Sequence, residues 1–138
     1  MISVLIADDQ IFVRHVLQSL LETAGDMQIV ATASNGQEAV ELAVVHCPNV
    51  AVVDVSMPIL DGVEATKQIC LQCPQTRVLI ASMSDASYHI QRCLQAGALG
   101  YVLKDGVDID LVKAVRSVYK GQRYFSQQVT EIAKQYLQ

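Results

Sequence analysis

The chain has 138 residues, 51% of them hydrophobic, and a formal net charge of -4. This length and composition suit a single domain with an apolar core, and the acidic balance excludes a sequence-wide attraction to nucleic acid or anionic lipid. The sequence has no apolar run of the length that a membrane span needs and no basic start typical of a signal peptide, so we expect a cytoplasmic protein without a membrane partner.

Short apolar runs rich in valine, isoleucine and leucine predict five strands. They are Ser3 to Ala7, Met27 to Ala33, Val50 to Val53, Arg77 to Ala81 and Gly100 to Leu103. The third run is apolar at every position, as expected for a strand that is buried on both faces of a sheet.

Each predicted strand is followed by a segment with helical signals. These segments are a stripe from Val13 to Ala24 closed by Gly25, a helix opened by a capping box from Ser34 to Gln37 and ended before Pro48, a helix from about Gly62 to Gln72, one around Ile90 to Leu94 that stops at Gly97, and one from Leu111 to Tyr119 that breaks at Gly121. The alternation of strand and helix predicts an α/β fold with a parallel sheet and helices on both faces.

Charged or hydroxyl side chains follow four of the predicted strands. Asp8 and Asp9 follow the first strand, Asp54 the third, Ser82 the fourth and Lys104 the fifth. The carboxyl ends of parallel strands form the edge at which open α/β sheets bind ligands. Three carboxylates gathered there repel one another unless a hard divalent cation binds them, and oxygen ligands suit Mg²⁺. The sequence therefore predicts a magnesium site.

Asp54 is the candidate nucleophile at this edge. The metal and the Lys104 ammonium would screen its charge, which would let the carboxylate approach a phosphoryl group. The Ser82 hydroxyl would donate a hydrogen bond to a phosphoryl oxygen. The residues thus favour phosphoryl transfer to a side chain of the protein itself.

Several motifs occur in an order that resembles a known family. They are Ile6-Ala7-Asp8-Asp9, Val53 to Pro58 with Asp61-Gly62, Ser82, Ala96-Gly97-Ala98 and Gly100 to Asp105. Together they cover residues 1 to about 120 and resemble the receiver domain of bacterial two-component response regulators, most similar to the NarL/FixJ kind that precedes a LuxR-type helix-turn-helix domain. The resemblance implies a flavodoxin-like doubly wound (βα)5 sandwich, with a five-stranded parallel sheet in the order 2-1-3-4-5 and a short C-terminal helical extension.

The resemblance also implies roles for the acidic edge. Asp54 would be the phospho-acceptor, and Lys104 would pair with the phosphoryl group. Asp9 would bind Mg²⁺ directly, together with Asp54 and the backbone carbonyl of Ser56, while Asp8 would act largely through water.

A conformational switch and three tuning positions are implied in the same way. Ser82 and Tyr101 would be the switch pair, the hydroxyl moving toward the phosphoryl group as the aromatic ring turns inward. Ser56, Met83 and Ser84 would tune the lifetime of the phosphoryl group. Met83 stands where the family commonly has a small residue, which predicts slow phosphorylation by small donors and slow hydrolysis. Comparison of both rates with those of Met83→Ala would test this.

The implied function is a phosphorylation-controlled signalling module that is no enzyme beyond its own phosphorylation and dephosphorylation. Its implied partners are a sensor histidine kinase and, after phosphorylation, a second copy of the chain. Residues 121-138 would form a linker with a helix from Gln127 to Leu137 capped by Ser126, and would lead to a transcription-regulating DNA-binding domain that this sequence lacks. A stand-alone receiver that acts through protein contacts is the alternative.

Two other functions use a similar sheet edge. A phosphatase of the haloacid dehalogenase sort also has an aspartate nucleophile and Mg²⁺, but it generally needs a second acid two residues later, where this chain has Ser56. Flavin binding needs a hydroxyl-rich loop after the first strand, and Asp8-Asp9-Gln10 would repel a phosphate there.

The remaining metal-binding or nucleophilic residue types give weaker signals. We expect the cysteines, Cys47, Cys70, Cys73 and Cys93, to be buried free thiols, with a zinc site or disulfide among the first three as the alternative. We interpret His15, His46 and His89 as surface or helix-face residues, and Tyr119 as a packing residue, because none has a spacing that indicates catalysis.

Overall fold

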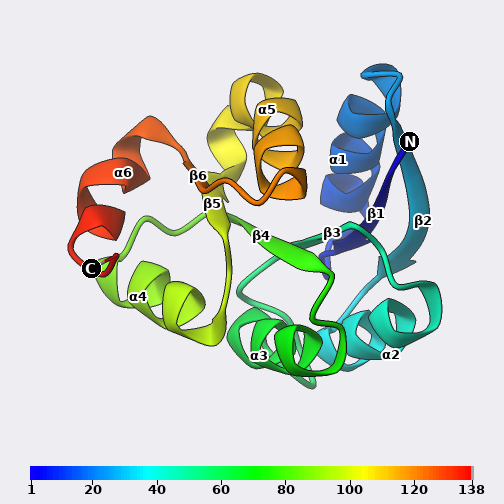
Figure 1. The fold of residues 1–138 in the computed structure, drawn as a ribbon, viewed down its shortest axis with the longest axis horizontal. Coiled ribbons are helices and arrows are strands. Elements are labelled where there is room, and N and C mark those ends of the chain that lie inside the picture. The colour runs from blue at the N-terminus through cyan, green and yellow to red at the C-terminus, as the bar shows by residue number, and fades with distance from the viewer. Residues whose placement is uncertain (138) are drawn as a thin grey trace.

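The computed structural model describes residues 1–137 and has one sheet with helices on both faces (Figure 1). The strands are β1 (Ile2–Ala7), β2 (Met27–Ala33), β3 (Val50–Val53), β4 (Arg77–Ser82), β5 (Gly100–Leu103) and β6 (Tyr124–Phe125). The helices are α1 (Ile11–Thr23), α2 (Gly36–His46), α3 (Gly62–Gln72), α4 (Ser87–Ala96), α5 (Val107–Tyr119) and α6 (Gln127–Lys134), with a 3-10 turn over Lys104–Gly106. All strand pairs are parallel, in the order β2-β1-β3-β4-β5-β6.

Alternate residues of each central strand contribute to two separate cores. In β3, Val50 and Val52 pack with α1 and α5, whereas Ala51 and Val53 pack with the helices of the other face, α2, α3 and α4 (Figure 1). Every residue of β3 and β5 is buried. This two-sided burial explains why the strands are continuous apolar runs in the sequence, and it confirms the predicted doubly wound architecture.

The sheet has one more strand than we predicted. β6 lies beside β5, where Tyr101 pairs with Phe125, and α6 then packs against α4. Ser126 begins α6, but its hydroxyl does not cap that helix. Instead its Oγ accepts a hydrogen bond of 2.9 Å from the backbone N–H of Leu103 and donates one of 3.2 Å to Asp110. The C-terminal segment is thus bonded to β5 and α5.

The start of α2 differs by one residue from the predicted capping box. Asn35 is the N-cap, and its side chain accepts a hydrogen bond of 2.8 Å from the N–H of Glu38. The Glu38 carboxylate accepts one of 3.0 Å from the N–H of Ser34. Asn35 and Glu38 therefore take the roles that the prediction gave to Ser34 and Gln37.

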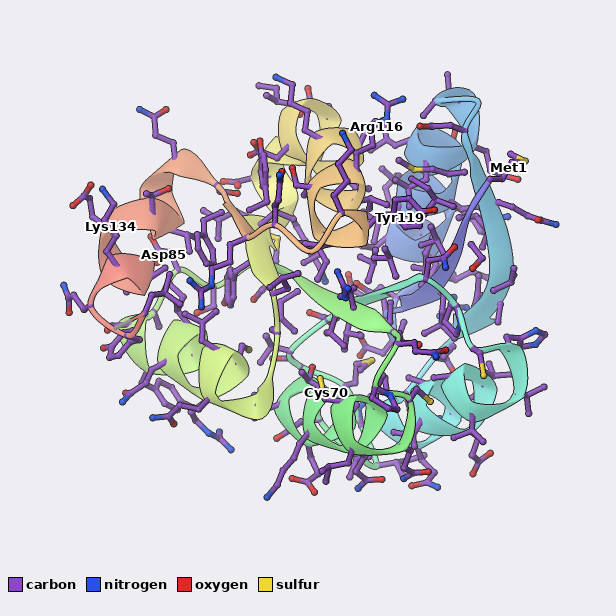
Figure 2. The ribbon with its side chains drawn as sticks, in the orientation of Figure 1. Met1, Cys70, Asp85, Arg116, Tyr119 and Lys134 are labelled. Carbon is purple, nitrogen blue, oxygen red and sulfur yellow. The ribbon has the colours of Figure 1, made fainter. Side chains whose placement is uncertain are left out.

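The cysteines are all free thiols, and one of them is not buried as expected. Cys47 is exposed because it follows the last turn of α2 in a left-handed conformation, with φ 45°. Cys70, on α3 in Figure 2, is half-buried, while Cys73 and Cys93 are buried. Tyr119, at the end of α5, is 46% exposed, so its predicted packing role was wrong in large part.

Among residues 1–137 no helix has the length and apolar character that crossing a membrane requires.

Candidate functional site

The acidic residues meet because β1 and β3 are neighbours in the sheet. Ala7 pairs with Val53, so the next residues, Asp8 and Asp54, leave the sheet side by side. The N–H of Asp54 donates a hydrogen bond of 2.9 Å to the carbonyl of Ala7, which extends the ladder by one step. One carboxylate oxygen from each of Asp8, Asp9 and Asp54 lies within 4.8 Å of the others. This is the predicted cluster, and within the described chain it is the one group of three such ligands.

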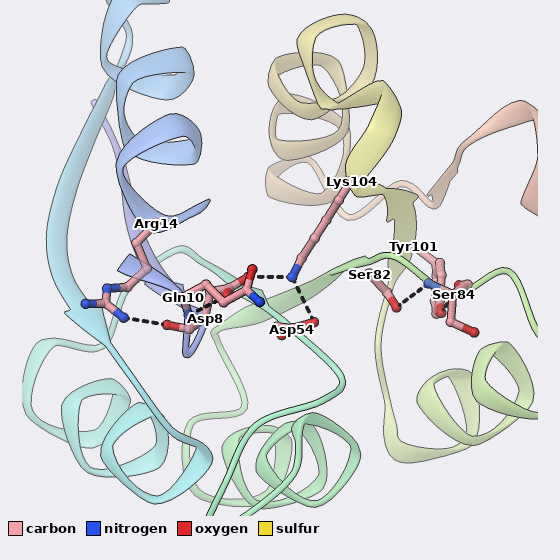
Figure 3. Close-up of polar contacts among 8 residues, drawn as sticks. All are labelled: Asp8, Gln10, Arg14, Asp54, Ser82, Ser84, Tyr101 and Lys104. Atoms are coloured by element: carbon pink, nitrogen blue, oxygen red, sulfur yellow. Dashed lines mark hydrogen bonds and ion pairs between the residues drawn. The ribbon is translucent and has the colours of Figure 1, made fainter. Parts of the chain in front are cut away.

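Lys104 forms ion pairs with two of the three acids (Figure 3). Its Nζ lies 2.6 Å from Oδ2 of Asp8 and 3.1 Å from Oδ1 of Asp54, and its side chain is only 10% exposed. Burial raises the pKa of Asp54 above its ordinary value, Lys104 acts in the opposite direction, and the charge of Asp8 adds to the increase. The ammonium therefore offsets only part of the cost of keeping these carboxylates together.

The donor set fits a small divalent cation. Oδ1 of Asp8 accepts a hydrogen bond of 2.9 Å from the N–H of Gln10, and its buried Oδ2 has the Lys104 ammonium as its only partner among the described residues. Asp9 is exposed and forms no ion pair with any described residue. Carboxylate oxygens gathered beside an open cavity are the ligands that Mg²⁺ prefers.

A cavity of about 240 Å³ opens onto Asp54. Its walls include Asp9 and Lys104 as well as Ser56, Ser82, Met83 and Ser84. All the residues that the sequence predicted to handle the phosphoryl group or to tune its lifetime thus share this cavity. Met83 lines the cavity and is 72% exposed, and its predicted effect on the reaction rates stays a prediction.

A glycine shapes the loop between β3 and α3. The N–H of Gly62 donates a hydrogen bond of 2.8 Å to the carbonyl of Val55, and a Cβ at this position would collide with the carbonyl oxygen of Asp54. Asp61 then caps α3 through a bond of 2.9 Å from the N–H of Glu64. The Asp61-Gly62 pair therefore lets the loop fold back against the acceptor residue.

The proposed switch residues are linked through Ser84 (Figure 3). Tyr101 is fully buried, and its hydroxyl donates a hydrogen bond of 2.6 Å to the carbonyl of Ser84. The N–H of Ser84 donates one of 3.0 Å to Oγ of Ser82. Burial raises the pKa of Tyr101 to about 12, so this phenol stays a donor at neutral pH.

The sequence did not reveal three contacts around the site. The N–H of Gln10 binds the Asp8 carboxylate, and Arg14 donates a hydrogen bond of 2.7 Å to the Asp8 carbonyl. His89, which we had interpreted as a surface residue, lies 2.7 Å from the Ser84 hydroxyl through Nδ1. The Gln10 and Arg14 contacts follow from the tight turn into α1, whereas no sequence signal indicated the His89 contact.

Residues 4–116 match the family described as "Response regulator receiver domain". The chain belongs to this family. Receiver domains are generally signalling modules rather than enzymes, so the match favours the predicted receiver over the phosphatase and flavoprotein alternatives.

Relatives of this receiver domain are regulatory proteins. It is 39% identical over 128 residues to the oxygen regulatory protein NreC of Staphylococcus epidermidis, covering 92% of this chain and 59% of that protein. It is 42% identical over 121 residues to the transcriptional regulatory protein LnrK of Bacillus subtilis, covering 88% of this chain and 55% of that protein. The chain thus spans less than two thirds of the length of the curated relatives it matches.

Solved structures support the same assignment. A LuxR-family two-component response regulator from Aurantimonas superposes with a TM-score of 0.91 at 29% identity, over 96% of this chain and 95% of that one. A signal receiver domain assigned to NarL of Mycobacterium tuberculosis gives 0.84 at 34% identity, over 88% and 98%. The chain is therefore a NarL-type receiver domain.

Proposed function

We propose that this receiver domain accepts a phosphoryl group on Asp54 from a phosphohistidine of a sensor kinase, in a reaction that needs Mg²⁺. The observation that carries the proposal is the buried group of Asp8, Lys104 and Asp54, in which one ammonium lies 2.6 Å and 3.1 Å from the two acids. A carboxylate can approach a phosphoryl group only where positive charge offsets their repulsion, and Lys104 supplies such a charge beside an open cavity.

The transfer exchanges one bond for another at phosphorus. An oxygen of Asp54 forms a bond to phosphorus while the bond from phosphorus to the kinase's histidine nitrogen breaks, and its electron pair stays on the imidazole. Lys104 and the Ser82 hydroxyl contact the phosphoryl oxygens as their charge is redistributed. Water later attacks phosphorus, which releases phosphate and restores the carboxylate.

The acidic cluster would hold the metal. Asp9, Asp54 and the carbonyl of Ser56 are the proposed direct ligands, with Asp8 acting largely through water. A bound Mg²⁺ ion would add positive charge at the phosphoryl oxygens, which supports transfer chiefly by neutralisation and positioning. Lys104 contacts both Asp8 and the acceptor and would keep their carboxylates together.

The output of the switch is proposed from the relatives. NreC is named as an oxygen regulatory protein and LnrK as a transcriptional regulatory protein, and both are longer than this chain. We propose that residues 1-120 are the receiver domain and that residues 121–138 lead to a DNA-binding output domain in a longer protein. Action as a stand-alone receiver is the alternative.

A phosphorylation-dependent homodimer is the proposed intermediate between switch and output. A receiver of this fold occurs in a structure of two RcsB dimers bound to DNA, which is 24% identical to this chain. If phosphorylation shifts the population toward a dimer, sedimentation of this chain with Mg²⁺ should change after treatment with a phosphodonor. Unchanged sedimentation of fully phosphorylated protein would contradict dimer formation by this chain.

The proposed acceptor is tested by intact-protein mass spectrometry. The protein is incubated with acetyl phosphate and Mg²⁺, and we expect a gain of one phosphate in the wild type and none in Asp54→Asn. The matched control is Asp61→Asn in the same loop, since an asparagine still caps α3 and should leave phosphorylation intact. A wild type that gains no phosphate, or an Asp54→Asn that gains one equally well, would overturn the proposal.

A further inference from the structure

Ser84 is the centre of a hydrogen-bond network in the loop between β4 and α4. Its N–H donates to Oγ of Ser82 at 3.0 Å, and its carbonyl accepts from the Tyr101 hydroxyl at 2.6 Å. Its own Oγ accepts from the N–H of Ala86 at 3.1 Å and lies 2.7 Å from Nδ1 of His89. The backbone and the side chain of one residue therefore join both switch residues to His89.

His89 is held in position by its own neighbours. It lies in the first turn of α4, half-buried, with its ring centroid 4.3 Å from that of Tyr88. The Arg92 guanidinium lies 6.0 Å from the Tyr88 centroid. Among the described residues, His89 does not line the cavity that contains Asp54. It lines a neighbouring cavity with Ser56, and its hydrogen bond to Ser84 is its direct link to the switch residues.

The network leaves the Ser82 hydroxyl ready to donate. Because Oγ of Ser82 already accepts from the Ser84 N–H, its own hydrogen can be donated to a phosphoryl oxygen in the shared cavity. The same loop position supplies the carbonyl that keeps the Tyr101 hydroxyl bonded while the ring is fully buried. The hydrogen bonds that hold Ser84 thus belong to the same loop arrangement in which Ser82 can donate to a phosphoryl oxygen.

We propose that His89 is a positioning residue for the phosphorylation chemistry, since its bond to Ser84 holds the loop in the arrangement that buries Tyr101 and orients Ser82. The inference rests on the proposed function of Asp54. A contact present in the binding-competent arrangement raises the populated fraction of that arrangement, and apparent affinity for a phosphoryl group rises in proportion. Loss of one such hydrogen bond is expected to weaken binding about 3- to 10-fold.

The test uses beryllofluoride with Mg²⁺ as a mimic of the phosphoryl group, and fluorotyrosine-labelled protein observed by fluorine NMR. Tyr101→Phe assigns the Tyr101 signal. We expect His89→Ala to bind beryllofluoride about 3- to 10-fold more weakly than wild type and to shift the Tyr101 signal toward that of an exposed ring. His89→Asn should restore most of the affinity, because its amide offers both an oxygen acceptor and an N–H donor in place of Nδ1.

Two further variants separate this role from general weakening of α4. Ser87→Ala removes a hydroxyl from the same turn that lies 2.7 Å from the Tyr136 hydroxyl, so it should bind the mimic as wild type does. Addition of His89→Ala to Ser84→Ala should cause no further loss, because the two residues act through one bond.

The outcomes are distinguishable. Wild-type affinity and an unchanged Tyr101 signal in His89→Ala would overturn the role of His89 and leave the function of Asp54 standing. Equal loss in His89→Asn and His89→Ala, or additive losses in the double variant, would also overturn it. Failure of the wild type itself to bind the mimic would overturn both the inference and the proposed function.

Discussion

The two edges of the sheet carry polar residues that are satisfied in different ways. At the amino edge, the Asn49 amide oxygen accepts from the N–H and the hydroxyl of Ser3, at 2.8 Å and 3.0 Å. The Asn49 N–H returns a bond of 2.9 Å to Oγ of Ser3, and the buried Thr76 hydroxyl donates one of 2.7 Å to the Pro48 carbonyl. Neutral donors and acceptors are thus paired within the protein.

The carboxyl edge has charges in place of neutral pairs. Asp8 and Asp54 share the single ammonium of Lys104, which is the only partner of the buried Asp8 Oδ2 among the described residues. Burial raises the pKa of Asp54, which shows that its charged form is held at a cost. The comparison teaches that neutral pairs stabilise one edge, while the charges at the other edge are only partly offset within the protein.

The strongest way to break this comparison is to remove the ammonium. We expect Lys104→Met to lower the free energy of unfolding by about 3 kcal/mol in metal-free buffer, because two buried acids lose their counter-charge. Phosphorylation by acetyl phosphate should slow by about 100-fold, because the transferred group loses a stabilising charge. Urea unfolding and intact-mass time courses measure the two effects.

The control for this variant is Lys67→Met, on the exposed face of α3, which should behave as wild type. Mg²⁺ should stabilise Lys104→Met more than it stabilises the wild type, since the metal would take over the missing positive charge. Equal stabilisation of both proteins would mean that the acids and the ammonium are not coupled as described.

A change at the amino edge should lower the stability of the fold without slowing phosphorylation. Asn49→Ala removes the acceptor of both Ser3 bonds and is expected to cost about 2 kcal/mol of unfolding free energy. The phosphorylation rate of the folded protein should not change. Asn49→Asp keeps an oxygen acceptor and should lose less stability. A phosphorylation rate that falls in step with stability would show that the two edges are coupled.

The sequence predicted the parts that depend on burial and topology. The predicted strands Met27 to Ala33, Val50 to Val53 and Gly100 to Leu103 match β2, β3 and β5 residue for residue. β3 and β5 are covered on both faces and are apolar throughout, so their limits are visible as limits of composition. The position of Asp54 then follows, because the residue after a buried strand lies at the sheet edge.

The parts that the sequence could not predict depend on contacts between distant segments. β6 has only two residues, Tyr124 and Phe125, and it forms because the backbone of β5 offers free hydrogen-bonding groups at that position. Ser3 and Asn49 meet across 46 residues of sequence with no pattern to signal it. The contact of His89 with Ser84 is local, five residues apart, but it depends on the shape of the loop before α4, which no pattern in the sequence signals.

The smallest predicted effect concerns the pH dependence of stability. Because the pKa of Asp54 is raised on folding, the unfolded chain ionises this carboxyl at lower pH than the folded protein does. Its contribution is therefore neutral below the unfolded pKa, and it destabilises the fold increasingly as pH rises from about 4 toward the folded pKa. Asp54→Asn has no carboxyl at this position, so it should not lose stability in this way as pH rises.

In the presence of a chelator, the unfolding free energy of Asp54→Asn minus that of the wild type should therefore increase across this pH range. The increase should be smaller than the stability losses expected for the Lys104 and Asn49 variants. Asp61→Asn, whose carboxylate is exposed, should follow the wild type. With Mg²⁺ the trend should reverse, because the metal favours the ionised carboxylate. If, without metal, the wild type instead became more stable relative to Asp54→Asn as pH rises, the attraction of Lys104 for the Asp54 carboxylate would outweigh the cost of burying it. The ion pairs of the carboxyl edge would then stabilise the fold, as the neutral hydrogen bonds of the amino edge do.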